Sequence, residues 1–122
     1  SPFIAPETIT ACIKKYIQQT EYDCVATVSN VKEFLWKDGI PVNYDPTHAP
    51  NSQDLPDIVA LNFGATVVGR NTLIKNSNII GKKPCFIVTD EIEQIDIDTP
   101  LDFYLAEQMY IKLKVEKKEL LD

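Results

Sequence analysis

Residues 94–103 read QIDIDTPLDF, and this stretch sets an acidic strand end directly before a helix. Side chains two residues apart point to the same face of an extended strand, so Asp96 and Asp98 would project together while Ile95 and Ile97 face the opposite side. Paired carboxylates of this kind are typical ligands of a hard divalent cation such as Mg²⁺, with substrate phosphates completing its shell. The alternative interpretation is a solvated acidic strand end that binds nothing.

The helix that follows carries its own start signals. Thr99 is an N-cap residue, Pro100 suits the first helical position, and Asp102 would complete a capping box. We predict that this helix runs from Pro100 to about Lys117. An apolar stripe along one side of it consists of Leu101, Leu105, Met109 and Leu113.

Helices and strands alternate through most of the remaining chain. Residues 6–18 predict an amphipathic helix whose apolar side would pack on a sheet. Strands are predicted over residues 24–28, 58–68 and 85–88, and a short helix over residues 70–75. The long strand is interrupted near Asn62, Phe63 and Gly64, where glycine permits a bulge or the close approach of a ligand. This alternation predicts an α/β fold with a parallel sheet covered by helices.

Residues 31–57 depart from this rhythm, and we call them the inserted segment. Phe34 and Trp36 belong to an aromatic cluster, Asp38-Gly39 predicts a turn, and residues 41–44 suggest a second short strand. Together they predict a hairpin arm outside the main fold. Its aromatic side chains would either cover another surface or pack within the chain's own core.

Composition argues against some classes of partner. The chain holds 18 acidic and 12 basic residues, a net charge of −6, which argues against binding a nucleic-acid backbone. No apolar run approaches the length of a membrane span, so no membrane partner is expected. The three cysteines are far apart in sequence and lack the spacing of a metal site, which favours buried free thiols and a cytoplasmic location.

Several motifs occur together in a fixed order. The segment IDIDTPLDFYLAE (residues 95–107) is preceded by SQDLP (residues 52–56) and by the strand that carries Asn62 and Gly64. The chain opens with Ser1-Pro2-Phe3, followed by Pro6-Glu7-Thr8-Ile9. Across nearly all 122 residues, these motifs resemble the C-terminal half of the CMP-N-acetylneuraminate synthetase family, the acylneuraminate cytidylyltransferases.

The resemblance implies a Mg²⁺-dependent enzyme that transfers CMP from CTP to an acidic, sialic-acid-like (nonulosonic) sugar and releases pyrophosphate. It implies a Rossmann-like nucleotidyltransferase sheet, with Asp96 and Asp98 as the metal-binding and catalytic carboxylates. The inserted segment would correspond to the family's dimerisation arm, which reaches over the sugar site of the partner subunit. A homodimer or higher oligomer is therefore expected.

Four residues are further candidates for binding the sugar. Gln53 matches a family position near the sugar, where an amide binds hydroxyl groups, although a turn-forming polar residue is the alternative. Asn62 and Gly64 lie in the interrupted strand and would line the same pocket. Lys37 would supply a cation for the sugar carboxylate, or would be an ordinary solvated lysine.

The chain departs from the family pattern at the sugar pocket. Asn51 stands where the family commonly has an arginine that grips the substrate carboxylate, and an amide cannot form that charged, bidentate contact. Ala65 and Thr66 replace an aromatic pair that usually follows the glycine. These departures predict a substrate that differs from ordinary sialic acid.

One motif of the family is absent from these residues. Members have a glycine-rich, basic loop of the type ARxGSKGxPxKN that holds the nucleotide phosphates, whereas the 4 glycines here form no such loop. We therefore expect residues 1–122 to be the C-terminal part of a single domain whose nucleotide-binding half is missing, and to be inactive alone. The alternative is a non-catalytic dimerisation or sugar-binding remnant.

Overall fold

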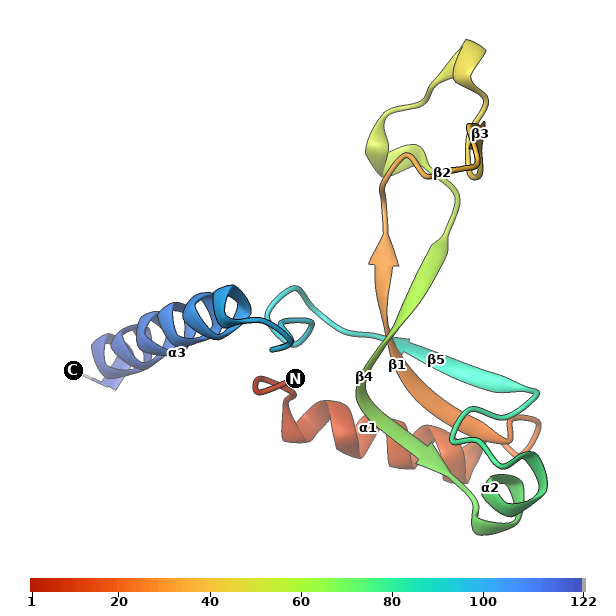
Figure 1. Cartoon of the computed structure of the whole chain (residues 1–122). Helices are drawn as coiled ribbons and strands as arrows, with labels where there is room; N and C mark the ends of the chain where they lie inside the picture. Colours follow the sequence, from red (N-terminus) through yellow and green to blue (C-terminus); the bar gives the residue numbers. More distant parts are fainter. Residues whose placement is uncertain (122) are drawn as a thin grey trace.

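The computed structural model describes residues 1–121 as a mixed α/β arrangement, with helices beside a small three-stranded sheet (Figure 1). The helices are α1 (Pro6–Gln18), α2 (Arg70–Asn76) and α3 (Pro100–Leu121). The strands are β1 (Cys24–Val31), β2 (Trp36–Lys37), β3 (Ile40–Pro41), β4 (Ile58–Val68) and β5 (Pro84–Val88). Two short 3-10 turns, Pro46–His48 and Ser52–Asp54, lie between β3 and β4. The α/β class predicted from the sequence agrees with this arrangement.

The main sheet is mixed, so the prediction of a parallel sheet is wrong in part. Its strand order is β4-β1-β5, with β1 and β5 parallel and β1 and β4 antiparallel. The antiparallel pair arises because the chain leaves β1, passes through the inserted segment and returns directly as β4. Parallel pairing needs a crossover instead, and the only parallel neighbour, β5, follows the crossover through β4 and α2.

The buried core is small and lies between α1 and the sheet. Cys12 of α1 packs with Val25 of β1 and Cys85 of β5, surrounded by partly buried side chains such as Tyr16 and Val67. The helix predicted over residues 6–18 is confirmed. All three cysteines are buried free thiols, and burial raises the pKa of the Cys12 and Cys24 thiols. Neutral thiols of this kind act as small apolar core residues.

The predicted interruption of the long strand is confirmed as an irregularity in the pairing of β4 with β1. Ala26 pairs with Thr66 and Val28 pairs with Leu61, so residues 62–65 of β4 lie opposite a single residue of β1, Thr27. Phe63 takes a left-handed backbone conformation with φ of 54°. The fully buried Thr27 hydroxyl bridges the distorted strand, accepting the Ala65 backbone N–H at 2.9 Å.

The inserted segment contains a very short two-stranded ladder, β2 with β3. Asp38 and Gly39 both have positive φ, 53° and 76°, as the predicted tight turn requires. The second strand predicted over residues 41–44 is wrong beyond Pro41. There the Asn43 side-chain amide replaces ladder hydrogen bonds, because it accepts the Leu35 N–H at 2.9 Å and donates to the Glu33 carbonyl at 2.8 Å.

The aromatic side chains of the inserted segment pack on one another. The ring centroids of Phe34 and Tyr44 are 4.8 Å apart in an edge-to-face arrangement, and the Trp36 indole N–H donates to the Tyr44 hydroxyl at 2.8 Å. Trp36 nevertheless stays 53% exposed. At the base of the segment, Lys32 donates to the Leu55 carbonyl and to Asp57, which ties its two legs together.

Helix α3 extends away from the sheet (Figure 1). Of its residues through Leu120, only Ala106 is buried, and Leu101 of the apolar stripe is 64% exposed. The helix contacts the N-terminal segment rather than the sheet, through a shallow groove that contains Phe3, Ala106 and Tyr110. Within residues 1–121, no helix combines the length and apolar character needed to cross a membrane.

Candidate functional site

The acidic segment does not form the strand that its alternating pattern predicts. β5 ends at Val88, and the chain then enters a turn over residues 91–94. The Asp90 carbonyl accepts the Gln94 N–H at 3.2 Å, and the Gln94 side chain donates back to the Thr89 carbonyl at 2.7 Å. These local bonds take the backbone out of the sheet, so Asp96 and Asp98 lie in an irregular connection and share no strand face.

The start of α3 is formed as the sequence predicts. The Asp102 carboxylate accepts the Thr99 N–H at 2.9 Å, and the Thr99 hydroxyl accepts the Asp102 N–H at 3.1 Å, which is a capping box. Asp102 also accepts the N–H of Asp98 at 3.1 Å. The Asp98 N–H, together with the hydrogen bonds from Thr99, holds the pKa of the Asp102 carboxyl below its ordinary value.

The two candidate metal ligands are exposed. The Asp96 side chain is 55% exposed and lies 3.5 Å from the Ser1 nitrogen, whereas the Asp98 carboxylate makes no hydrogen bond or ion pair within residues 1–121. Carboxylate oxygens are suitable donors for Mg²⁺. In the described part of the chain, no group of three or more acidic, histidine or cysteine side chains is arranged to hold a metal ion. A cation held here would therefore take its remaining ligands from outside these residues.

Asn62 lies at the centre of a side-chain network that leads toward the acidic segment. Its Nδ2 group donates to Thr89 at 2.8 Å and Ser29 at 3.0 Å. Its Oδ1 atom accepts from Thr27 at 2.7 Å and from the Gly64 N–H at 3.1 Å. Because Thr89 directly precedes the turn before the acidic segment, this network joins the interruption in β4 to that turn. The side-chain amide of Asn62 is already fully engaged in these contacts.

Gly64 lies in a closely packed position. A Cβ atom at this position would lie 3.1 Å from Ile4 Cδ1 and 3.1 Å from the buried Thr27 hydroxyl. The N-terminal segment, the interruption in β4 and the acidic turn thus meet in one region of the molecule. The sugar-binding roles of Asn62 and Gly64 remain predictions, and the Asn62 amide would have to give up one of its present hydrogen bonds to bind a sugar.

Gln53 and Lys37 lie in the inserted segment, far from this region within one chain. Lys37 is an exposed residue of β2, and Gln53 is an exposed residue of the second 3-10 turn. Figure 1 shows the inserted segment at the distal end of the β1–β4 ribbon, away from the N-terminus and α3. One chain therefore brings Asn62 and Gly64 toward the acidic segment but not Gln53 or Lys37.

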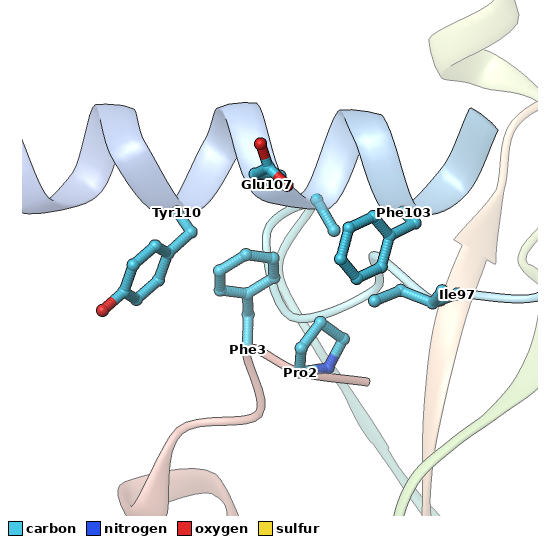
Figure 2. Close-up of a pocket in the computed structure, with 7 residues that line it drawn as sticks. Pro2, Phe3, Ile97, Phe103, Glu107 and Tyr110 are labelled. Atoms are coloured by element: carbon cyan, nitrogen blue, oxygen red, sulfur yellow. The ribbon is translucent and has the colours of Figure 1, made fainter. Parts of the chain in front are cut away.

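Sequence reasoning missed two features of the region. One is Glu93, a buried acidic residue in the turn before Asp96. The other is an apolar groove of about 320 Å³ in which Phe3 of the N-terminal segment lies against α3, between Phe103 and Tyr110 (Figure 2). Ile97, between the two aspartates, lines the same groove. Neither feature has a local sequence signal, because both depend on the docking of the N-terminal segment against residues 93–97.

Comparison with protein-family models gives no match to this chain, and comparison with curated proteins gives none either.

Proposed function

We propose that this chain is the metal- and sugar-binding part of an acylneuraminate-type cytidylyltransferase, which transfers CMP from CTP to a nonulosonic sugar and releases pyrophosphate. The observation that carries the proposal is the placement of Asp96 and Asp98. They lie between a hydrogen-bonded turn and a capped helix, in a region joined through Thr89 to Asn62. The two carboxylates are exposed and make few contacts with the rest of the chain. They lie beside the polar interruption in β4.

The charge distribution supports a cation between this surface and a phosphate. Residues 90–102 contain six acidic side chains and no Lys, Arg or His. The N-terminal ends of α1 and α3, which would otherwise attract anions, are already engaged by the carboxylates of Glu93 and Asp102. Asp96 and Asp98 would hold Mg²⁺, which when bound supplies the positive charge that a nucleoside triphosphate needs at this surface.

The inserted segment would complete the site of a second subunit. Lys37 and Gln53 are exposed on it and do not approach the acidic segment of their own chain. In a homodimer or higher oligomer, they would supply a cation for the sugar carboxylate and an amide for its hydroxyl groups. The nucleotide half is contributed by residues outside this chain, so the isolated chain would not turn over. Three buried free thiols fit a protein of the reducing cytoplasm.

The proposal is tested by the reaction of the full-length protein. Pyrophosphate release is measured with CTP, Mg²⁺ and a panel of nonulosonic acids, with ATP, GTP and UTP as nucleotide controls. We expect sugar-dependent pyrophosphate release that is fastest with CTP. Binding of a sugar without pyrophosphate release from any nucleotide would instead support a non-catalytic remnant and overturn the proposal.

A further inference from the structure

Glu93 is a buried acidic residue in the turn after β5, and its carboxylate binds the start of α1. Of the charged residues in the described part of the chain, only Glu93 is buried, with 8% of its surface exposed. Its Oε2 atom accepts the Ala5 N–H at 3.1 Å and the Thr8 hydroxyl at 2.5 Å, both at the start of α1. A buried carboxylate is costly unless hydrogen bonds and a helix N-terminus compensate its charge. Glu93 therefore fastens the turn after β5 to α1.

The turn that carries Glu93 is itself closed by hydrogen bonds. The Asp90 carboxylate accepts the Glu93 N–H at 2.8 Å, and the Ile92 carbonyl accepts the Ile95 N–H at 3.2 Å. On the outer side, the Glu93 carbonyl accepts the Ser1 hydroxyl at 2.5 Å. Main chain and side chain of Glu93 are thus both engaged, which leaves this residue little freedom to move relative to α1.

The segment that follows has few contacts of its own: Asp96 lies 3.5 Å from the Ser1 nitrogen, and Ile97 lines the groove beside Phe3. In the described residues, no backbone–backbone hydrogen bond involves Asp96 or Ile97. At the far end, the Asp98 N–H is held by Asp102 in the cap of α3. At the near end, the side chains of Glu93 and Gln94 are both anchored, but the Gln94 amide bonds only within its own turn, to the Thr89 carbonyl, whereas Glu93 reaches α1. A displacement of Glu93 would therefore be passed along the chain directly to the two exposed carboxylates.

We propose that Glu93 is a positioning residue, which sets the place of Asp96 and Asp98 by anchoring their segment to the start of α1. This inference rests on the proposed function, since it concerns the carboxylates that would hold Mg²⁺ there. Glu93 is not itself a ligand, because its carboxylate is buried against α1. Side chains that hydrogen-bond to metal ligands change metal affinity by roughly 10–100-fold when they are altered. Glu93 acts through the backbone of its segment, so we expect an effect at the lower end of that range.

Two substitutions weaken the contact between Glu93 and α1, one at each partner. Glu93→Gln removes the charge and keeps the shape of the side chain. Thr8→Val removes one hydrogen-bond donor and leaves Glu93 in place, so it still tests the anchor if the first variant fails to fold. Their matched controls are Glu91→Gln, an exposed glutamate of the same turn, and Thr8→Ser, which keeps the hydroxyl group.

The experiment measures the Mg²⁺ dissociation constant of the full-length protein by isothermal titration calorimetry, and in parallel its pyrophosphate release as a function of Mg²⁺ concentration. The dissociation constant should change by the same factor as the Mg²⁺ concentration for half-maximal turnover. We expect Glu93→Gln to raise the Mg²⁺ concentration for half-maximal turnover by roughly 10-fold or more, and Thr8→Val to raise it by a smaller factor. At saturating Mg²⁺ both variants should regain most of the wild-type kcat, and both controls should match the wild type. A merely structural role would lower turnover equally at every Mg²⁺ concentration.

Each outcome separates this inference from the proposed function. If the wild type turns over with Mg²⁺ while Glu93→Gln and Thr8→Val keep its Mg²⁺ dependence, the positioning role is wrong and the proposed function stands. An equal loss at all Mg²⁺ concentrations overturns the positioning role in the same way. If the wild type shows no Mg²⁺-dependent turnover, the proposed function is wrong and the role of Glu93 falls with it.

Discussion

At the scale of single residues, the region beside the acidic segment is organised by small and polar side chains in close contact. The Thr27 hydroxyl, the Asn62 amide and the Gly64 N–H replace the ladder hydrogen bonds that the sheet loses where β4 is interrupted. Burying polar groups without partners would cost free energy, and no buried side-chain N or O atom in the described residues lacks one. The buried polar side chains at the interruption in β4 thus all have hydrogen-bond partners.

Gly64→Ala should destabilise the protein. The added Cβ would lie 3.1 Å from Ile4 Cδ1 and from the Thr27 hydroxyl, so these side chains must give way by a few tenths of an ångström, and Thr27 is held by hydrogen bonds to Asn62 and Ala65. Overpacking of this kind costs about 1–3 kcal/mol. The free energy of unfolding, measured with urea in the full-length protein, should fall by that amount. Ala60→Ser is the control, because Ala60 is an exposed residue of the same strand and the added atom would meet solvent. Equal stability of Gly64→Ala and wild type would contradict the packing argument.

Asn51→Arg should change sugar preference. Asn51 immediately precedes the 3-10 turn that carries Gln53, and its side chain forms no cap there. A charge-assisted, bidentate contact with a sugar carboxylate is worth roughly 1.5–3 kcal/mol, which corresponds to about 10–160-fold in kcat/KM. We expect the wild type to prefer another nonulosonic acid and the variant to gain activity with N-acetylneuraminate. A wild type that already prefers N-acetylneuraminate, together with an unchanged variant, would refute the altered specificity.

At the scale of elements, local signals were predictable and long-range ones were not. The cap of α3 follows from side chains within a few residues of the helix start, and the start of α1 follows from Pro6 at its first position. The extended strand end expected at Asp96 and Asp98 does not form, because Asp90 and Gln94 close a turn, which the alternating pattern cannot reveal. The anchor at Glu93 joins residues more than 80 positions apart in sequence, so no spacing could indicate it.

The cap of α3 should weaken in acid. Hydrogen bonds in the folded state hold the pKa of Asp102 below its ordinary value of about 3.9. The unfolded chain therefore takes up the proton first, and the stabilisation by Asp102 is complete above that pH and is lost as the pH falls through the lower folded pKa. Asp102→Asn should lower stability at neutral pH, and its difference from wild type should shrink in strong acid.

Urea unfolding at several pH values checks this prediction. Glu116→Gln, which removes an exposed acid from the other end of α3, is the control. A stability difference between Asp102→Asn and wild type that stays the same from neutral pH to strong acid would show that the carboxylate does not act through its charge.

At the scale of the whole molecule, the described residues leave many apolar side chains exposed. About half or more of the side-chain surface is exposed at Phe63 of β4, at Val88 of the sheet-edge strand β5 and at Ile111 of α3. The core between α1 and the sheet is correspondingly small. An open strand edge beside apolar surface is a ready site of association. In the proposed enzyme, a nucleotide-binding half would cover part of this surface.

The isolated chain should therefore associate. We expect light scattering to report oligomers or aggregates that grow with concentration. Val88→Lys should reduce association through the open edge of β5. Trp36→Ser should reduce association through the inserted segment. Comparing the two variants shows which surface mediates the association. A monodisperse monomer at high concentration would contradict this prediction.

The central claim is that Asp96 and Asp98 hold the metal of a cytidylyltransferase, and their substitution tests it most directly. Pyrophosphate release from CTP is measured in the full-length wild type, Asp96→Asn and Asp98→Asn, with Glu91→Gln as control. Both aspartates are exposed and support no core, so each variant should stay folded and lose most of its Mg²⁺-dependent turnover, while the control keeps it. Wild-type turnover in both folded aspartate variants would contradict the claim.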